Sequence, residues 1–275
     1  MTLPNFFILG AAKCGTTSLA NNLRAHPEVF IPEIKEVRFF DTEPSWTQGV
    51  PWYECFYEPA TDERALGDAT PSYLYVPVVV ERLKETIVGP VRHIALVREP
   101  VDRTYSHYWH RYREGEESRT FDEVLDEELG GAVGWGYVGR SRYREQLDRY
   151  VAAFGRASLH VALFEDFVSD PTGSYAAICR HLGVDDAFVP EDLGERYNTH
   201  FVIVRPRLYS FLIAIRAGKT TPEPVRRWLW SKIASFQEYV PIEDAARERL
   251  RGYFAPHNRA LEELLGRDLS ALWGY

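Results

Sequence analysis

A short loop rich in glycine and hydroxyl residues is the part of this 275-residue sequence best suited to bind an anion. It runs from Gly10 to Ser18, reads GAAKCGTTS, and directly follows the apolar run that starts at Asn5. Where a buried strand passes through such a loop into a helix, backbone N–H groups and the positive end of the helix point toward one place. Lys13 adds a compact positive charge that suits a phosphate or sulfate. The loop therefore predicts a binding site for a small anion.

The order of residues in this loop differs from that of a nucleoside triphosphate-binding loop. Gly10 and Gly15 have the Walker A spacing, but Thr16 and Thr17 follow the second glycine where a lysine and a hydroxyl residue are expected. Lys13 instead lies inside the loop, and the loop has no obvious magnesium ligand. A P-loop kinase with an unusual loop stays an alternative, as does a plain strand–helix turn with an exposed lysine.

The loop and several later segments together resemble sulfotransferases that use 3′-phosphoadenosine 5′-phosphosulfate (PAPS). The resemblance is greatest to the glycan, heparan sulfate-type branch of that family and its bacterial relatives. It covers most of the chain, and the combination is far more specific than any one segment. In chain order the segments are AAKCGTTSL, HPEVFIPEIKEVRFFD (26–41), GDATPSYLY (67–75), VREPVDRTYSHY (97–108), GRSRYREQL (139–147) and YFAPHNRALEELLGRDLSALW (253–273).

The resemblance implies a role for particular residues. Lys13 would act on the bridging and leaving oxygens of the donor, and Glu36 would be the general base that takes the acceptor proton. Arg98 and Ser106 would hold the 3′-phosphate, and the product would be 3′,5′-adenosine bisphosphate, with no metal required. The residues implied to contact PAPS are Lys13, Cys14, Gly15, Thr16, Thr17, Ser18, Arg98, Ser106, Arg205 and Arg207.

Each of these residues also has an ordinary structural explanation. Glu36 lies in a run of alternating charges, which is typical of a solvated surface. Arg98 could pair with a neighbouring acid, and Ser106 could lie on a helix surface. His107 and His110 are rival bases whose spacing could suit a metal, but no third ligand accompanies them. We expect ordinary packing or hydrogen bonding for both histidines.

One departure from the heparan-type pattern concerns the acceptor. Ala69 stands where those enzymes carry a lysine before the Thr-Pro pair. This loss of a cation disfavours a polyanionic acceptor. We therefore predict a PAPS-dependent sulfotransferase that acts on a hydroxyl, in preference to an amine, of a sugar-containing or other small metabolite. A nucleotide-binding module without catalysis is the alternative from a different class.

Apolar runs and helical patterns alternate along the chain. Strands are predicted at 5–10, 91–98 and 159–164. Helices are predicted at 16–25, 79–86, 103–112, 121–128, 141–154, 174–182 and 244–265. This alternation predicts an α/β fold, a P-loop-like three-layer arrangement with a central parallel sheet flanked by helices. We expect one sulfotransferase domain over residues 1–275.

Composition sets further limits. At 45% hydrophobic and 26% charged residues, the chain is not of the disordered class. Its net charge of −8 argues against a nucleic-acid partner. Three scattered cysteines and the lack of an apolar run of about 20 residues favour a cytoplasmic enzyme without a transmembrane segment. The basic, aromatic stripe at 210–236 is expected to pack on the core, to cover a hydrophobic acceptor, or to make weak contact with a membrane surface.

Overall fold

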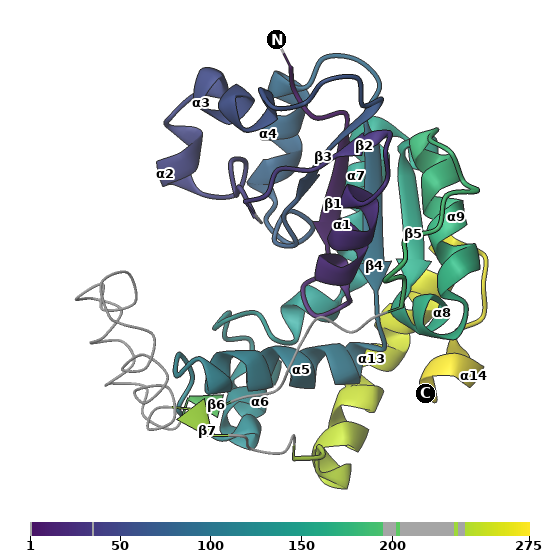
Figure 1. The fold of residues 1–275 in the computed structure, drawn as a ribbon. Helices are drawn as coiled ribbons and strands as arrows, with labels where there is room; N and C mark the ends of the chain where they lie inside the picture. Colours follow the sequence, from purple (N-terminus) through teal and green to yellow (C-terminus); the bar gives the residue numbers. More distant parts are fainter. Residues whose placement is uncertain (1, 35, 195–201, 204–233, 236–239) are drawn as a thin grey trace.

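A five-stranded parallel sheet forms the centre of the protein (Figure 1). The computed structural model describes residues 2–34, 36–194, 202–203, 234–235 and 240–275. The strand order is β2-β3-β1-β4-β5, so that the first long strand lies in the middle and the chain leaves it in both directions. This confirms the predicted α/β class. The strands are β1 (Phe6–Gly10), β2 (Val29–Phe30), β3 (Ala65–Ala69), β4 (Arg92–Val97) and β5 (Leu159–Leu163).

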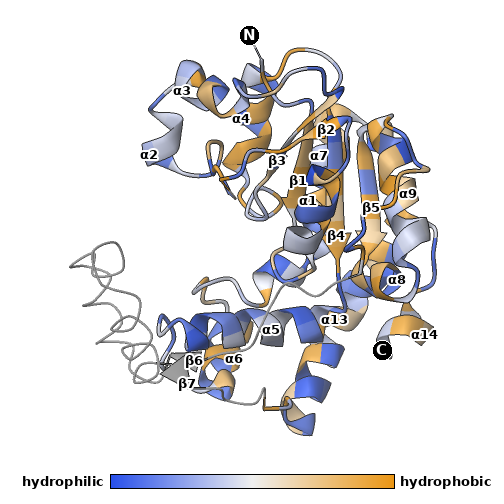
Figure 2. Ribbon diagram, viewed as in Figure 1, coloured by the Kyte–Doolittle hydropathy of each residue, from blue (hydrophilic) through white to orange (hydrophobic). Residues whose placement is uncertain are grey.

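The inner strands β1 and β4 are apolar, whereas the inner strand β3 is made of small residues. Every residue of β1 is buried, and β4 is buried beyond its first residue, as expected of apolar strands covered on both faces (Figure 2). β3 reads ALGDA and was not predicted, because its residues are small rather than apolar. Gly67 pairs with Phe6, and a Cβ on Gly67 would lie 2.1 Å from the Phe6 ring. The phenyl ring therefore occupies the space that a side chain on β3 would need.

Helices cover both faces of the sheet. On one face Tyr175 Oη of α9 donates to the carbonyl oxygen of Asn22 in α1, and on the other α4 packs against α7 (Figure 1). Asp170 caps α9 by accepting from the N–H of Gly173, and Pro171 follows at the first helical position. These helices are α1 (Thr16–Arg24), α4 (Val78–Thr86), α7 (Tyr143–Phe154) and α9 (Pro171–Leu182).

Three further helices lie beyond the carboxyl ends of the strands (Figure 1). They are α5 (Pro100–Arg113), α6 (Phe121–Leu129) and α13 (Asp244–Leu265). Inward side chains of α5, α6 and the first half of α13 form a second apolar core, which includes Tyr105, Leu125 and Leu250, whereas Leu261 near the end of α13 belongs to the core around the sheet. α5 starts three residues before the predicted position, because Glu99 caps it and Pro100 fits the first turn. The other predicted helices and strands agree with the structure to within three residues.

Short elements complete the described chain. They are α2 (Glu43–Trp46), α3 (Val50–Glu54), α8 (Phe164–Ser169), α14 (Ser270–Trp273), the 3-10 turns Cys55–Tyr57, Gly139–Ser141 and Arg156–Ser158, and the antiparallel pair β6 (Val202–Ile203) and β7 (Ala234–Ser235). No helix within the described ranges is both long and apolar enough to cross a membrane. The predicted donor contacts Arg205 and Arg207 and the basic stripe at 210–236 fall outside the residues described above, apart from the β7 pair within the stripe.

A buried carboxylate fastens the segment before α2 to the end of β3. Asp68 is 1% exposed and accepts hydrogen bonds from the hydroxyls of Tyr53 (2.6 Å), Thr70 (2.6 Å) and Tyr73 (3.0 Å). Burial raises the pKa of Asp68. Tyr73 Oη in turn accepts from the backbone N–H of Phe40 at 3.3 Å. This network holds the loop that carries Glu36 against the carboxyl end of the sheet.

Candidate active site

The loop after β1 is held between the ends of β3 and β4. Gly10 has φ 147°, and a Cβ there would lie 2.6 Å from the carbonyl oxygen of Pro71. The N–H of Ala11 donates to the carbonyl oxygen of Leu96 at 2.6 Å. The N–H of Cys14 donates to the carbonyl oxygen of Ala11 at 3.2 Å, which closes a turn within the loop. Only glycine permits this close approach. The loop is therefore fixed at the middle of the sheet, where the strand order reverses, which is the usual ligand position in such sheets.

The helix that follows the loop presents an open positive end. Gly15 lies at the N-cap of α1 with φ 88°, and a Cβ there would lie 3.2 Å from the Phe164 ring. No side chain caps α1, and its first turn holds no acidic residue. Thr16, Thr17 and Ser18 make up that turn. An anion at this point would meet the helix dipole and the hydroxyl groups together.

Lys13 lies in the loop in a strained backbone conformation. Its φ is 75°, a region that costs a residue with a Cβ about 1–3 kcal/mol and that clusters at functional sites. Its side chain is half-buried. Burial raises the pKa of Glu114, which follows α5, and the positive charge of Lys13 acts against that rise.

Cys14 is a packing residue in this loop rather than a nucleophile. Its side chain is fully buried, with Sγ 3.9 Å from Tyr143 Oη. Burial raises the pKa of the Cys14 thiol to about 11. The thiol is therefore protonated at neutral pH, whereas the thiolate is the reactive form.

Tyr143 connects the loop to Arg98. Its hydroxyl donates to the carbonyl oxygen of Arg98 at 2.9 Å and accepts from the Arg98 N–H at 3.4 Å. The guanidinium of Arg98 lies 5.0 Å from the centre of the Phe164 ring and 3.7 Å from Asp102. Asp102 is closer to Arg247, at 3.2 Å. The backbone of Arg98 is thus fixed by Tyr143, while its guanidinium is only weakly paired with Asp102. Such a guanidinium can bind an anion.

The second residue of the predicted pair, Ser106, lies on α5 and is half-buried. The two neighbouring histidines on α5 both have contacts within the protein. His107 is buried with Nδ1 3.4 Å from an Arg103 nitrogen, and His110 Nδ1 lies 3.5 Å from Glu114. Within the described chain, no cluster of three or more His, Cys, Asp or Glu could hold a metal ion.

Glu36 lies in a second strained loop, which also lies at the carboxyl ends of the strands. Both Glu36 (φ 64°) and Arg38 (φ 58°) have left-handed backbones. The N–H of Arg38 donates to Thr70 Oγ1 at 3.4 Å, and its guanidinium pairs with Asp41 at 2.9 Å. Ser72 Oγ also donates to Asp41, at 2.5 Å. Residues 70–72 therefore contact both the anion loop and the Glu36 loop, which brings the two predicted catalytic residues to one region.

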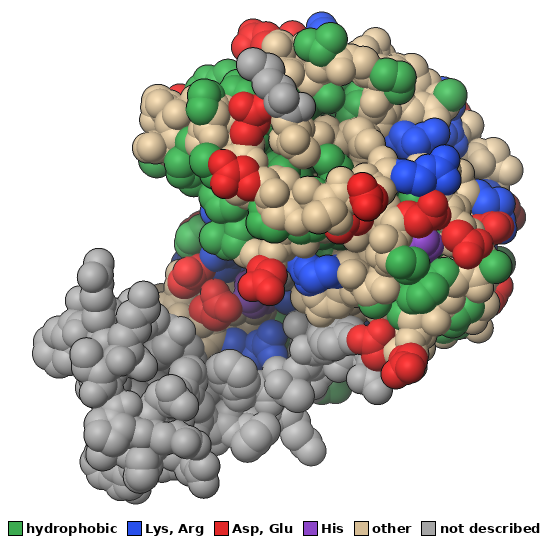
Figure 3. All heavy atoms as spheres, turned by 45° about the horizontal axis from the view of Figure 1, so that its top comes forward, with side chains coloured by type: hydrophobic (Ala, Val, Ile, Leu, Met, Phe, Trp, Pro, Cys, Tyr) green, Lys and Arg blue, Asp and Glu red, His purple; other side chains and the backbone are tan. Residues whose placement is uncertain are grey.

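The exposure of Glu36 and the position of Ala69 bear on the acceptor side. Glu36 is exposed, so that an acceptor would have to supply the partial burial that favours a base. Ala69 is 6% exposed at the end of β3. In the space-filling view of Figure 3, acidic, basic and histidine side chains gather around the middle of the molecule. The region is mixed in charge rather than uniformly basic.

Glu99 lies next to the candidate site, and the sequence analysis did not identify it. It follows Arg98 directly, its carboxylate accepts from the Asp102 N–H at 2.6 Å, and its own N–H donates to Glu165 at 2.8 Å. Burial raises the pKa of Glu99 to about 7. The sequence signal was the acidic residue immediately before a proline at a helix start.

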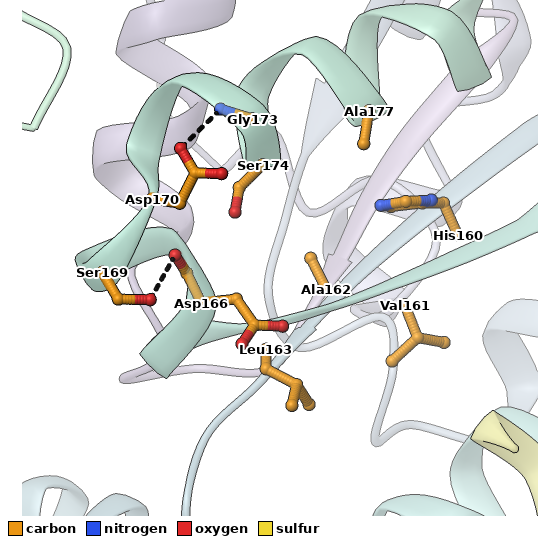
Figure 4. Close-up of a pocket in the computed structure, with 10 residues that line it drawn as sticks. All are labelled: His160, Val161, Ala162, Leu163, Asp166, Ser169, Asp170, Gly173, Ser174 and Ala177. Carbon is orange, nitrogen blue, oxygen red and sulfur yellow. Dashed lines mark hydrogen bonds between the residues drawn. The ribbon is translucent and has the colours of Figure 1, made fainter. Parts of the chain in front are cut away.

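A cavity of about 370 Å³ lies beside the edge strand β5, between α8 and α9 (Figure 4). Three of its polar side chains already have structural partners. Asp170 caps α9, Ser169 Oγ donates to the carbonyl oxygen of Asp166, and the Asp166 carboxylate pairs with Arg267. The cavity lacks the residues of the anion loop and is not part of the candidate site.

A family model and a solved structure both relate this chain to sulfotransferases. Residues 3–202 match the family described as the sulfotransferase domain. A sulfotransferase from Alicyclobacillus acidocaldarius has 29% sequence identity and a TM-score of 0.75, with 100% of both chains covered.

Two curated relatives match over different lengths. The membrane-associated sulfotransferase kil1 of Dictyostelium discoideum is 30% identical over 154 residues, which are 53% of this chain and 32% of that protein. The human heparan sulfate glucosamine 3-O-sulfotransferase 3B1 is 23% identical over 269 residues, which are 97% of this chain and 64% of that protein. The chain thus spans a third to two thirds of the length of these relatives.

The raised pKa of Glu99 predicts how the stability depends on pH. The folded protein keeps a proton that the unfolded chain, with a pKa of 4.5, releases. The stabilisation is complete below the unfolded pKa and is lost as the pH rises through about 7. Between about pH 5.5 and pH 8 the free energy of unfolding should fall by about 2 kcal/mol more in the parent than in Glu99→Gln.

Denaturant unfolding at the two pH values measures this difference. Glu81→Gln, on the exposed surface of α4, is the control and should follow the parent. An identical pH dependence for the parent and Glu99→Gln would contradict the burial of a protonated Glu99.

Proposed function

The chain belongs to the sulfotransferase domain family, and from this membership we propose that it transfers a sulfuryl group from PAPS to a hydroxyl group of a sugar-containing or other small acceptor. One observation carries the proposal. Tyr143 joins the loop of Cys14, at 3.9 Å, to the backbone of Arg98, at 2.9 Å. The positive end of α1 and the side chain of Arg98 are thereby held together at the carboxyl ends of the central strands. This arrangement suits a donor with phosphate at two positions.

The reaction needs three contributions from the protein. The bond between sulfur and the oxygen bridging to the 5′-phosphate breaks, and its electron pair stays on that phosphate oxygen. Lys13 would neutralise the charge that develops there. A new bond forms between sulfur and the acceptor oxygen, whose proton would pass to Glu36. The released product would be 3′,5′-adenosine bisphosphate, and the fixed loops would align donor and acceptor.

The acceptor class follows from the charges near Glu36. Ala69 provides no cation, and the guanidinium of Arg38 is already paired with Asp41. A heavily sulfated chain would lack compensating charge at these two positions. These features support a hydroxyl of a weakly charged sugar or small metabolite, whereas one relative is named for its action on heparan sulfate.

Localisation in the cytoplasm is part of the proposal. The three cysteines, Cys14, Cys55 and Cys179, are all free thiols, and Cys55 is exposed. Exposed free thiols are typical of reducing compartments. The Dictyostelium relative, by contrast, is named as membrane-associated.

An acceptor screen with labelled PAPS tests the function. Products of the parent should gain one SO₃ group, detected by mass spectrometry. In Lys13→Met, turnover should fall by at least about 100-fold because the charge at the leaving oxygen is lost. Lys84→Met, an exposed lysine on α4, is the matched control and should keep full turnover. Near-normal turnover of Lys13→Met would exclude the role given to Lys13.

Glu36→Gln separates catalysis from binding. We expect turnover to fall by about 100-fold or more, because the base is lost, while the affinity for 3′,5′-adenosine bisphosphate is unchanged. Glu33→Gln, an exposed acid in the same segment, is the control. Binding of the bisphosphate by a parent that makes no product with any acceptor would instead favour a nucleotide-binding module.

Arg98→Ala tests the 3′-phosphate contact. The variant should bind 3′,5′-adenosine bisphosphate at least about tenfold more weakly than the parent, because a charge-assisted phosphate contact is lost. Its affinity for 5′-AMP should change far less. Calorimetric titration measures both, with the exposed Arg64→Ala as control. Equal losses for the two nucleotides would be inconsistent with this assignment.

A further inference from the structure

Arg103 is a buried arginine that the proposed reaction does not use. It lies on α5, and its side chain is 0% exposed. Nη2 donates to the carbonyl oxygen of Tyr137 at 2.6 Å and lies 3.4 Å from Nδ1 of His107. Nε and Nη1 are buried and have no hydrogen-bond partner among the described residues. Buried donors without partners are rare and call for an explanation.

The charge of Arg103 has no direct counter-charge. No carboxylate in the described part of the chain forms an ion pair with it. Glu128 is the acid whose charge acts on it, but that carboxylate accepts from the backbone N–H groups of Tyr137 (2.9 Å) and Val138 (2.7 Å). Burial, and then the charge of Arg103, hold the pKa of His107 well below its usual value, so that the ring is neutral. Arginine itself stays protonated in proteins.

The charge of Arg103 also acts on the loop that contains Cys14. Burial raises the pKa of Cys14, and among the groups that oppose this rise the charge of Arg103 comes first. Burial also raises the pKa of Tyr143, and the charge of Arg103 opposes that rise. The Tyr143 hydroxyl donates a hydrogen bond to the carbonyl oxygen of Arg98. Arg103 lies one turn into α5, where its backbone N–H donates to the carbonyl oxygen of Glu99, the residue after Arg98, at 2.9 Å. An isolated charge removed from water is costly unless an opposite charge approaches.

We propose that Arg103 is a positioning residue whose buried charge, which has no ion-pair partner among the described residues, attracts the phosphates of the donor through the loop and Arg98 without touching them. The inference rests on the proposed function, because the compensating anion is the nucleotide. A charge in a low-dielectric interior acts over longer distances and is screened less by salt than a surface charge. Its effect should therefore extend to any nucleotide phosphate at the site and should persist at high salt.

Arg103→Gln and Arg103→Lys separate the charge from the hydrogen bond. Glutamine keeps a donor for the Tyr137 carbonyl and removes the charge, while lysine keeps the charge. We expect Arg103→Gln to bind both 3′,5′-adenosine bisphosphate and 5′-AMP about tenfold more weakly than the parent, at low and at high salt. Arg103→Lys should stay within about threefold of the parent. Without nucleotide, Arg103→Gln should be at least as stable as the parent, because an uncompensated charge is gone.

Titration calorimetry and thermal unfolding provide these readouts. Arg92→Gln is the matched control, since Arg92 also donates to a backbone carbonyl, at 2.8 Å, but lies at the opposite end of β4. Unchanged affinity of a folded Arg103→Gln would overturn the inference, as would an equal loss in Arg103→Lys. An Arg103→Gln variant that is unfolded or less stable than the parent would overturn it too, because the charge would then stabilise the fold itself. A parent that binds neither nucleotide would contradict the proposed donor as well.

Discussion

The contact between Gly10 and the carbonyl oxygen of Pro71 is the constraint on which the rest of the site depends. A Cβ at Gly10 would come within 2.6 Å of that oxygen, so that only glycine allows the two segments to meet. Because they meet, the anion loop lies beside residues 70–72, which also hold the Glu36 loop through Thr70. The Asp68 network fixes that second loop from behind. One close backbone approach thus sets the distance between the proposed leaving-group cation and the proposed base.

Local charge, rather than net charge, decides what this site can bind. The chain carries a net charge of −8, yet the proposed donor is itself strongly anionic. Three positive groups, namely Lys13, Arg98 and the uncapped start of α1, lie among acidic side chains at the carboxyl ends of the strands. Arg103 adds a buried charge one turn into α5. Elsewhere most described cations are paired with nearby acids, and the acidic surface argues only against a broad polyanionic partner.

Sequence reasoning succeeded where a single local signal was strong. The apolar run of β1, its terminal glycine and the hydroxyl-rich start of α1 predicted a loop between a buried strand and a helix, and the structure has that loop there. It failed for β3, because the ALGDA segment is made of small residues that fit beneath the Phe6 ring, a contact across strands. Arg103 was missed because a charged residue beside Asp102 has the pattern of an exposed helix surface. Its burial depends on the 130–142 segment folding over α5, which no local pattern reveals.

A structure of the chain bound to 3′,5′-adenosine bisphosphate tests the central claim most directly. The account predicts the 5′-phosphate at the loop of residues 11–18, within reach of Lys13, and the 3′-phosphate on the guanidinium of Arg98 and the hydroxyl of Ser106. Neither phosphate should touch Arg103. A nucleotide bound away from the carboxyl ends of the strands, or one with its 3′-phosphate remote from Arg98, would contradict it.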